Sequence, residues 1–310
     1  MVERKEQKIL NELIQDLKNK DFKYVAKEEK EIDWSSYNLA RINEINAYLI
    51  FVREAVNNAY VEISTVKGPG RPPTAARDLA KIILVQGFFE VAERQASGLA
   101  TLFKEKLGLE NDPSPRTVGR AYRRRDVQDI LGKVFEMTHE PITNKETSFS
   151  ADGTGLPLSI KQNYANDRDN QEKHAGYDKA VIMISNNYHI ATGFIHANGT
   201  ANDCPLFAPV LEQTTKNFHN IEKVDLDAGF LSHENCKKID DAGAIPYIYP
   251  KEGILIKQNG YPAWKRMLKQ LIKDPQCWLE EYHERSQNEC YFSSHKRRFS
   301  RPLLKKIKEL

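Results

Sequence analysis

A chain of 310 residues is long enough to form two domains, each with its own hydrophobic core, which excludes a small scaffold held together by disulfides. Its 46 Lys and Arg residues nearly balance its 43 Asp and Glu residues, so the net charge of +3 says little about a partner. The four cysteines lack the paired spacing of zinc sites, and no apolar run has the length of a signal peptide core or a membrane span. These features predict a soluble cytoplasmic protein with reduced thiols.

The N-terminal third has the pattern of helices. Apolar residues recur at helical spacing from Ile9 to Leu17 and again from Leu39 to Val56. The segment 67–73 is too rich in Gly and Pro for a helix, and we interpret it as a linker. Its tripeptide Gly70-Arg71-Pro72 also matches the core of an AT-hook, a motif that reads the minor groove. The linker is the favoured interpretation, because a match of three residues is short.

Three more helices are predicted between Thr74 and Val134. Ser114 and Pro115 suit the N-cap and first turn of one of them, which carries a run of basic residues. These residues are Arg116, Arg120, Arg123, Arg124 and Arg125. Such a run fits an ordinary solvated face, and it equally fits a helix-turn-helix over about 77–134 that presents arginines to DNA.

After Pro141 the pattern changes to strands and then to an alternation of strands and helices. Strands are expected at 147–159, 180–185, 189–196, 223–226 and 244–249, with helices at 205–218, at 232–241 and from 261 onward. The order is therefore β, β, β, α, β, α, β, α. This order predicts an RNase H-like α/β domain, a mixed sheet flanked by helices, preceded by an all-helical region.

Two aspartates lie at positions where a carboxylate is more typical of a functional site than of a structural role. Asp152 lies within a strand of apolar and small residues and is followed by Gly-Thr-Gly. Asp227 follows the fourth strand, at the carboxyl edge where open α/β sheets form their sites. Asp225 competes with Asp227, because residues two apart on a strand point to the same face. The position at the strand end favours Asp227.

A third acid, Glu289, lies in a patterned segment near the C-terminus. Tyr282, Arg285, Glu289 and Lys296 form the pattern Y-x2-R-x3-E-x6-K. On one helix, offsets of 3, 7 and 14 residues fall within a stripe roughly 60° wide, so the four side chains face the same way. Three clustered carboxylates are sufficient to hold the metal ions that assist phosphodiester cleavage.

With this pattern, the segment from about Ser148 to Lys296 resembles the DDE transposases of bacterial and archaeal insertion sequences. The first Asp lies in SADGTGL, the second in DLDAGF, and the Glu in the signature. The resemblance implies that Asp152, Asp227 and Glu289 are catalytic and bind two Mg²⁺ or Mn²⁺ ions per active site. It also implies that Arg285 and Lys296 contact DNA phosphates near the cleavage site, with Tyr282 completing the signature.

The same resemblance implies an organisation and a set of partners. Residues 1–146 would form a helical region for recognition of DNA ends, with Arg116, Arg120, Arg123 and Arg124 as candidate contacts, and residues 147–310 the catalytic domain. The partners would be double-stranded DNA, as transposon ends and target, and a second copy of the chain on that DNA. The protein would act in the cytoplasm of a prokaryotic cell, associated with the nucleoid, and not at a membrane.

Two other functions are compatible with parts of the pattern. A non-catalytic DNA-binding protein descended from a transposase would be expected to have a damaged acidic triad, whereas this triad is intact. Another RNase H-like nuclease would not require the Tyr, Arg and Lys around the Glu. No large insertion separates Asp227 from Glu289, where some relatives carry a β-rich domain that assists hairpin cleavage.

Overall fold

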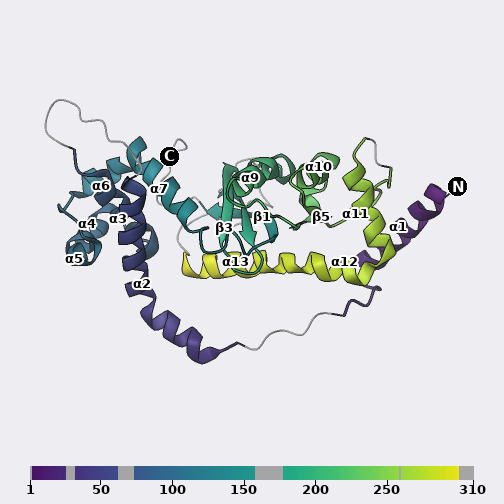
Figure 1. Cartoon of the computed structure of the whole chain (residues 1–310), viewed down its shortest axis with the longest axis horizontal. Coiled ribbons are helices and arrows are strands. Elements are labelled where there is room, and N and C mark those ends of the chain that lie inside the picture. The colour runs from purple at the N-terminus through teal and green to yellow at the C-terminus, as the bar shows by residue number, and fades with distance from the viewer. Residues whose placement is uncertain (1, 26–31, 62–72, 158–176, 258–259, 300–310) are drawn as a thin grey trace, which may run out of the picture. The chain divides into compact units, whose positions relative to one another are not determined.

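The computed structural model describes residues 2–25, 32–61, 73–157, 177–257 and 260–299 (Figure 1). The chain forms two compact units, one built from Met1–Glu28 and Pro141–Leu303, the other from Glu29–Glu140. Each unit has its own hydrophobic core. The proposed linker at 67–73, including the AT-hook tripeptide, lies almost entirely outside the described residues, as does the expected loop at 163–173.

The second unit is entirely helical in the part of the chain that is described. Its helices are α2 (Trp34–Val61), α3 (Ala76–Phe89), α4 (Glu93–Leu102), α5 (Lys104–Leu107), α6 (Pro115–Ala121) and α7 (Arg125–Met137). The segment from 74 to 134 was expected to hold three helices, but it holds five shorter ones. Ser114 is the N-cap of α6 as predicted, and its hydroxyl accepts a hydrogen bond from the Thr117 amide.

The first unit contains a five-stranded mixed sheet with the strand order β3-β2-β1-β4-β5. Its strands are β1 (Ser148–Pro157), β2 (Tyr177–Ser185), β3 (Ala191–Asn198), β4 (Lys223–Leu226) and β5 (Ile245–Ile248). The first three strands are antiparallel neighbours, whereas β4 pairs in parallel with β1 and with β5. This topology confirms the predicted RNase H-like α/β fold.

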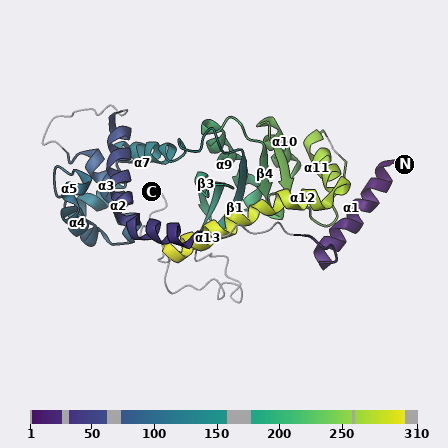
Figure 2. The ribbon, with the colours of Figure 1, turned by 60° about the horizontal axis from the view of Figure 1, so that its bottom comes forward.

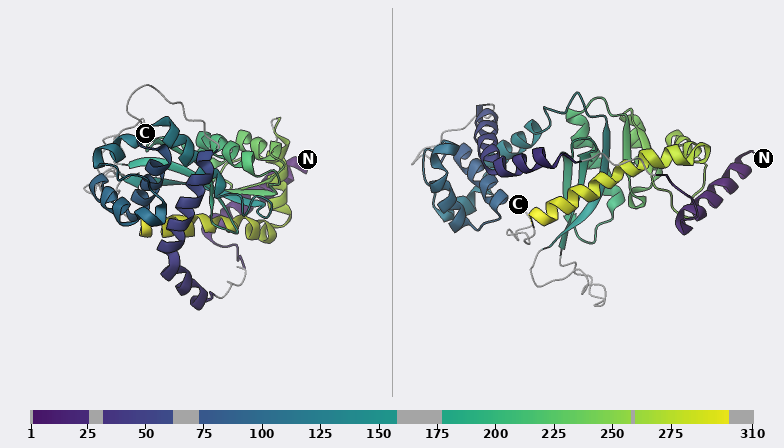
Figure 3. Two further views of the ribbon diagram at one scale, coloured as in Figure 1. Left: turned by 60° about the vertical axis from the view of Figure 1, so that its left-hand side comes forward. Right: turned by 90° about the horizontal axis from the view of Figure 1, so that it is seen from below.

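Helices cover both faces of this sheet. They are α9 (Asp203–Asn217), α10 (His233–Asp241), α11 (Pro262–Lys273), α12 (Pro275–Tyr282) and α13 (Ser286–Arg298), with 3₁₀ turns η1 (Ala228–Phe230) and η2 (His283–Arg285). Figures 1 and 2 show α9 and α10 on one face and the α12–α13 rod on the other, and Figure 3 shows this rod crossing the strands. The site is built on the face that the rod covers.

Alternation along β1 explains why the two faces differ. Phe149 and Ala151 are fully buried in the core on the α9 side, whereas Ser148, Ser150 and Asp152 point to the face beneath α12 and α13. On β3, Gly193 lets α9 come close, because a Cβ there would lie 2.6 Å from the Val210 carbonyl oxygen. One face is therefore apolar and tightly packed, and the other is lined with polar groups.

The N-terminal helix α1 (Val2–Asn19) belongs to the unit that contains the sheet, not to the helical unit in which the division at residue 146 placed it. Its apolar stripe of Leu10, Leu13 and Ile14 is buried in the same core as the sheet. Gln7 also bridges the loop before α11, donating to the Ile254 carbonyl at 2.9 Å and accepting from the Ile256 amide at 2.8 Å. A stripe of this kind shows that α1 packs against something, but it does not show which partner covers it.

This packing predicts that Leu10→Ala destabilises the sheet-containing unit. Leu10 is 0% exposed, so the truncation leaves a cavity that should lower the free energy of unfolding by about 2–5 kcal/mol. The matched control is Ile9→Ala, whose side chain is 39% exposed and should change stability by less than about 0.5 kcal/mol. Urea unfolding measures both, and equal effects would contradict the assignment of α1 to this core.

Candidate active site

Asp152 and Asp227 lie on neighbouring strands at the centre of the sheet. The parallel register pairs Ser150 with Asp225 and Ala151 with Leu226, so Asp152 and Asp227 follow the last pair on their strands. Each carboxylate is oriented by the backbone amide of the next residue, Gly153 or Ala228, at 2.7 Å. Asp227 is also the N-cap of the turn η1. The two acids therefore lie next to each other, where the parallel pairing of β1 and β4 ends.

Arg285 connects the sheet to the signature helix. Its guanidinium donates to Asp152 Oδ2 at 3.2 Å and to Glu289 Oε1 at 3.1 Å. Its Nε donates to the Tyr282 hydroxyl at 3.1 Å, and only 17% of the Arg285 side chain is exposed. Tyr282 is itself held by stacking on Trp278, with ring centroids 5.5 Å apart. One arginine thus joins an acid on β1 to the acid on α13.

The electrostatics of Asp152 reflect this crowding of charges. Burial raises the pKa of Asp152, and the charges of Asp227 and Glu289 raise it further. The Gly153 amide and the Arg285 guanidinium act in the opposite direction without cancelling the rise in pKa. Asp227 and Glu289 therefore lie near enough to Asp152 for their charges to act on it, and a bound cation would offset this repulsion.

The spacing of the signature residues predicted one continuous α-helix, but the structure breaks this segment. The 3₁₀ turn η2 separates α12 from α13 at residues 283–285. Arg285 and Glu289 still share a face, as their ion pair shows. Lys296 is exposed on α13, and Glu289 is also largely exposed, at 66% of its side chain. Glu281, four residues before Arg285, pairs instead with Lys223.

The rival acid, Asp225, lies in a different environment. It is 0% exposed and accepts a hydrogen bond from Asn186 Nδ2 at 2.8 Å. Burial raises the pKa of Asp225 well above its ordinary value. Asp227 is only partly buried and lies at the strand end. This difference favours Asp227 as the accessible ligand.

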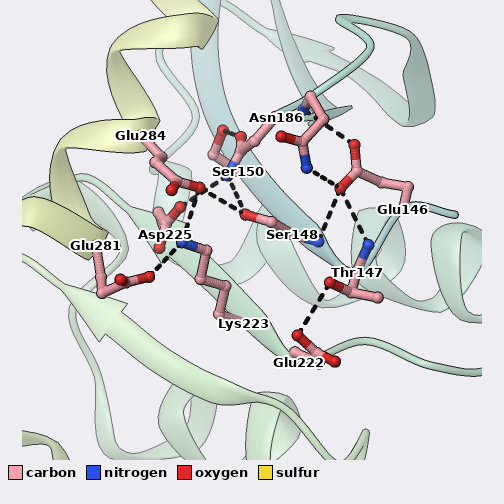
Figure 4. Close-up of polar contacts among 11 residues, drawn as sticks. Glu146, Thr147, Ser148, Ser150, Asn186, Glu222, Lys223, Asp225, Glu281 and Glu284 are labelled. Atoms are coloured by element: carbon pink, nitrogen blue, oxygen red, sulfur yellow. Dashed lines mark hydrogen bonds and ion pairs between the residues drawn. The ribbon is translucent and has the colours of Figure 1, made fainter. Parts of the chain in front are cut away.

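Asp225 belongs to a polar network that the sequence did not single out. Figure 4 shows Lys223 on β4 reaching Glu281 and Glu284, with Ser148 beside Glu284, and Asn186, which follows β2, donates a hydrogen bond to Ser148. The alternation Ser148-x-Ser150-x-Asp152 on β1 and Lys223-x-Asp225-x-Asp227 on β4 was the signal available for it.

A divalent cation fits the chemistry of the candidate acids. Carboxylate oxygens are the ligands that Mg²⁺ and Mn²⁺ prefer, and Mg²⁺ needs only one or two of them directly. Within the described ranges, however, no three His, Cys, Asp or Glu side chains are gathered closely enough to hold a metal ion. The donor set is therefore suitable, while the side chains are arranged around Arg285.

The candidate DNA-binding arginines of the helical unit differ in their surroundings. Arg116 and Arg120 on α6 are exposed, and with Arg94 of α4 they line an open hollow of about 600 Å³. Arg123 is exposed in the turn after α6, which ends at Ala121. Arg124 is engaged elsewhere: it binds Asp126 through two nitrogens and donates to the Thr74 carbonyl. Arg94 was not identified from the sequence, because it lies on a different helix.

The remaining sequence expectations concern thiols and membranes. All four cysteines are free, as predicted. Among the residues that the structure describes, no helix has the length and apolar character needed to cross a membrane.

A mixed sheet of this order, with acids at the ends of adjacent strands β1 and β4 and a third on a helix across them, defines the RNase H-like class of DNA-processing enzymes. A family model described as transposase DDE domain matches residues 143–308. The probable transposase for insertion sequence element ISA1214 of Archaeoglobus fulgidus is similar, with 25% identity over 284 residues, which cover 89% of this chain and 82% of the relative.

The chain belongs to the DDE transposase family, which confirms the resemblance inferred from the signature. It is a transposase, and enzymes of this class bind, cut and join DNA.

Proposed function

We propose that Asp152, Asp227 and Glu289 form the active site that cuts insertion-sequence ends and joins them to target DNA. The observation that carries this proposal is the guanidinium of Arg285, which bridges Asp152 on the sheet and Glu289 on the signature helix. This bridge places residues 137 positions apart (289 − 152) in one cluster, next to Asp227.

We propose that the three carboxylates hold two divalent ions, Mg²⁺ or Mn²⁺. When bound, such ions supply an activated water or hydroxyl and stabilise the leaving oxygen of the phosphodiester. The contribution of the chain is to orient the ligands: the Gly153 and Ala228 amides hold the two aspartates in place. Burial, and after it the charges of Asp227 and Glu289, raise the pKa of Asp152, and a bound cation would stabilise the charged form of these acids.

Arg285 is placed to bind the phosphate that is cut. A guanidinium stays charged at any working pH and can donate to two phosphate oxygens at once. Tyr282 orients it, and its ring also lies 5.8 Å from the guanidinium carbon. Lys296, exposed further along α13, extends the basic side of the rod and would contact the DNA backbone beyond the cleavage site.

We propose that the helical unit recognises the element ends through α6. Its exposed Arg116 and Arg120, with Arg94 of α4, form a cationic surface suited to phosphates, and Arg123 lies just beyond. Transposition brings two ends together, so we also propose a homodimer on DNA. A stable complex of one subunit with both ends, seen by sedimentation, would contradict the dimer.

The proposed triad predicts that Asp152→Asn, Asp227→Asn and Glu289→Gln each abolish DNA cleavage while retaining the fold and end binding. Each change removes a metal ligand and very little packing. Cleavage of a labelled element end in Mg²⁺ measures the loss, and Asp225→Asn is the matched control that should remain active. Full activity of any of the three variants would remove that residue from the site.

The role of Arg285 predicts a graded loss. Arg285→Lys keeps the positive charge but loses the guanidinium group that donates two hydrogen bonds at once. The rate of single-turnover cleavage should therefore fall about 10 to 100-fold if one charge-assisted hydrogen bond of about 1.5–3 kcal/mol is lost. Arg285→Ala should be slower still. If Arg285 served only helix stability, both variants would cut at the normal rate on pre-assembled end complexes and differ only in melting temperature.

The DNA-binding surface predicts a change in salt dependence. Replacing both Arg116 and Arg120 with Ala should weaken end binding and reduce the slope of log affinity against log salt by about 1.8, since two counterions fewer are released. Arg124→Ala is the control, because Arg124 pairs with Asp126 and should lower stability without changing the slope. An unchanged slope in the double variant would make this surface an ordinary solvated face.

A further inference from the structure

A second polar layer lies behind the candidate active site, at the positions two and four residues before Asp152 and Asp227. The parallel register pairs Ser148 with Lys223 and Ser150 with Asp225. Because side chains two apart on a strand share a face, this layer lies under the same helical rod as Asp152 and Asp227. Figure 4 shows how these residues converge.

Lys223 is the centre of this layer. Its Nζ lies 2.5 Å from Glu281 Oε2 and 2.7 Å from Glu284 Oε2, and its side chain is only 14% exposed. Burial acts to lower the pKa of Lys223, but the hydrogen bonds that Lys223 donates to both glutamates and the charge of Asp225 raise this pKa overall. The lysine therefore stays protonated and holds the carboxylates of Glu281 on α12 and Glu284 on η2 against β4.

The strand side of this contact is itself braced. Ser148 Oγ donates to Glu284 Oε2 at 3.1 Å, which ties the same glutamate to β1. Asn186 Nδ2 donates to Ser148 Oγ at 2.7 Å and to Asp225 Oδ2 at 2.8 Å, joining β1 and β4 at this level. Glu284 is thus anchored to both strands that carry the catalytic aspartates.

We propose that Lys223 is a positioning residue for DNA cleavage, which acts through Glu281 and Glu284 to set the place of Arg285 and Glu289 opposite Asp152 and Asp227. Glu284 immediately precedes Arg285 in η2, and Glu281 lies one turn earlier. The inference rests on the proposed function of the triad. It adds a residue outside the signature, on the strand rather than on the helix.

A directional contact is needed here because apolar packing is not directional. The rod could slide along the sheet by one residue, about 1.5 Å, while keeping much of its buried apolar surface. A misplacement of about 1 Å at an active site can cost 100-fold in rate. The two ion pairs of the Lys223 ammonium oppose that slide, and one of them is to Glu284, the residue before Arg285.

The experiment compares four variants of the full chain with wild type. Lys223→Met removes the ammonium but leaves two partly buried carboxylates unpaired, which can impair folding. The triple variant Lys223→Met/Glu281→Gln/Glu284→Gln removes all three charges together and avoids that problem. Lys223→Arg keeps a cation that can bind both glutamates. Lys265→Met, which breaks the ion pair with the exposed Glu3 between α11 and α1, is the control for loss of a single ion pair outside the site.

Three quantities are measured: affinity for a labelled element end, single-turnover cleavage in Mg²⁺, and hydrogen exchange of the backbone amides at 281–298. We expect the triple variant to bind ends as wild type does, to cleave about 10 to 100-fold more slowly, and to lose exchange protection in this segment. Lys223→Arg should restore most of the rate and the protection. Lys265→Met should match wild type in all three.

Wild-type cleavage by the triple variant, or a Lys223→Arg variant as slow as the triple variant, would overturn the positioning role. Asp152→Asn run in the same assay separates this failure from that of the proposed function. Full cleavage by Asp152→Asn would overturn the active site itself, whereas an inactive Asp152→Asn beside a fully active triple variant would overturn only the role of Lys223.

Discussion

The structure of the candidate active site depends on ion pairs between the polar face of two central strands and the helical rod that crosses them. Lys223 binds Glu281 and Glu284, and Arg285 binds Asp152. Burying charges costs free energy unless they are paired with good geometry, so these contacts are poor candidates for stability alone. These ion pairs instead fix the orientation of the rod, so that Glu289 on α13 lies near Asp152 and Asp227.

The rest of the sheet-containing unit packs against the opposite, apolar face of the sheet. Phe149 and Ala151, which alternate with the polar residues of β1, are buried beneath α9 and α10 in one large core. Gly193 permits the close approach of α9. A tightly packed layer behind the sheet keeps β1 and β4 rigid, and a rigid pair of strands gives Asp152 and Asp227 a fixed separation.

The two units differ in where their charged side chains lie, and this difference is the basis of the roles proposed for them. The unit with the sheet concentrates buried and partly buried charges at one edge, whereas the helical unit keeps exposed arginines around α6. A site that cuts phosphodiesters needs clustered carboxylates, and a surface that only holds DNA needs cations near phosphates. The N-terminal helix α1 belongs to the sheet-containing unit although the helical unit follows it in the chain, since Leu10 of α1 lies in the core of that unit.

The sequence alone determined the order of strands and helices along the chain, the position of Asp152 within its strand and of Asp227 after its strand, and the shared face of Arg285 and Glu289, because these depend on local periodicity. It also indicated the family, through spacing within one segment. Only the tertiary structure decided that Asp225 is buried while Asp227 is accessible, that Glu281 pairs with Lys223 and not with Arg285, and that Arg124 is occupied by Asp126. Periodicity defines a face, but the partner that covers it depends on how distant segments pack.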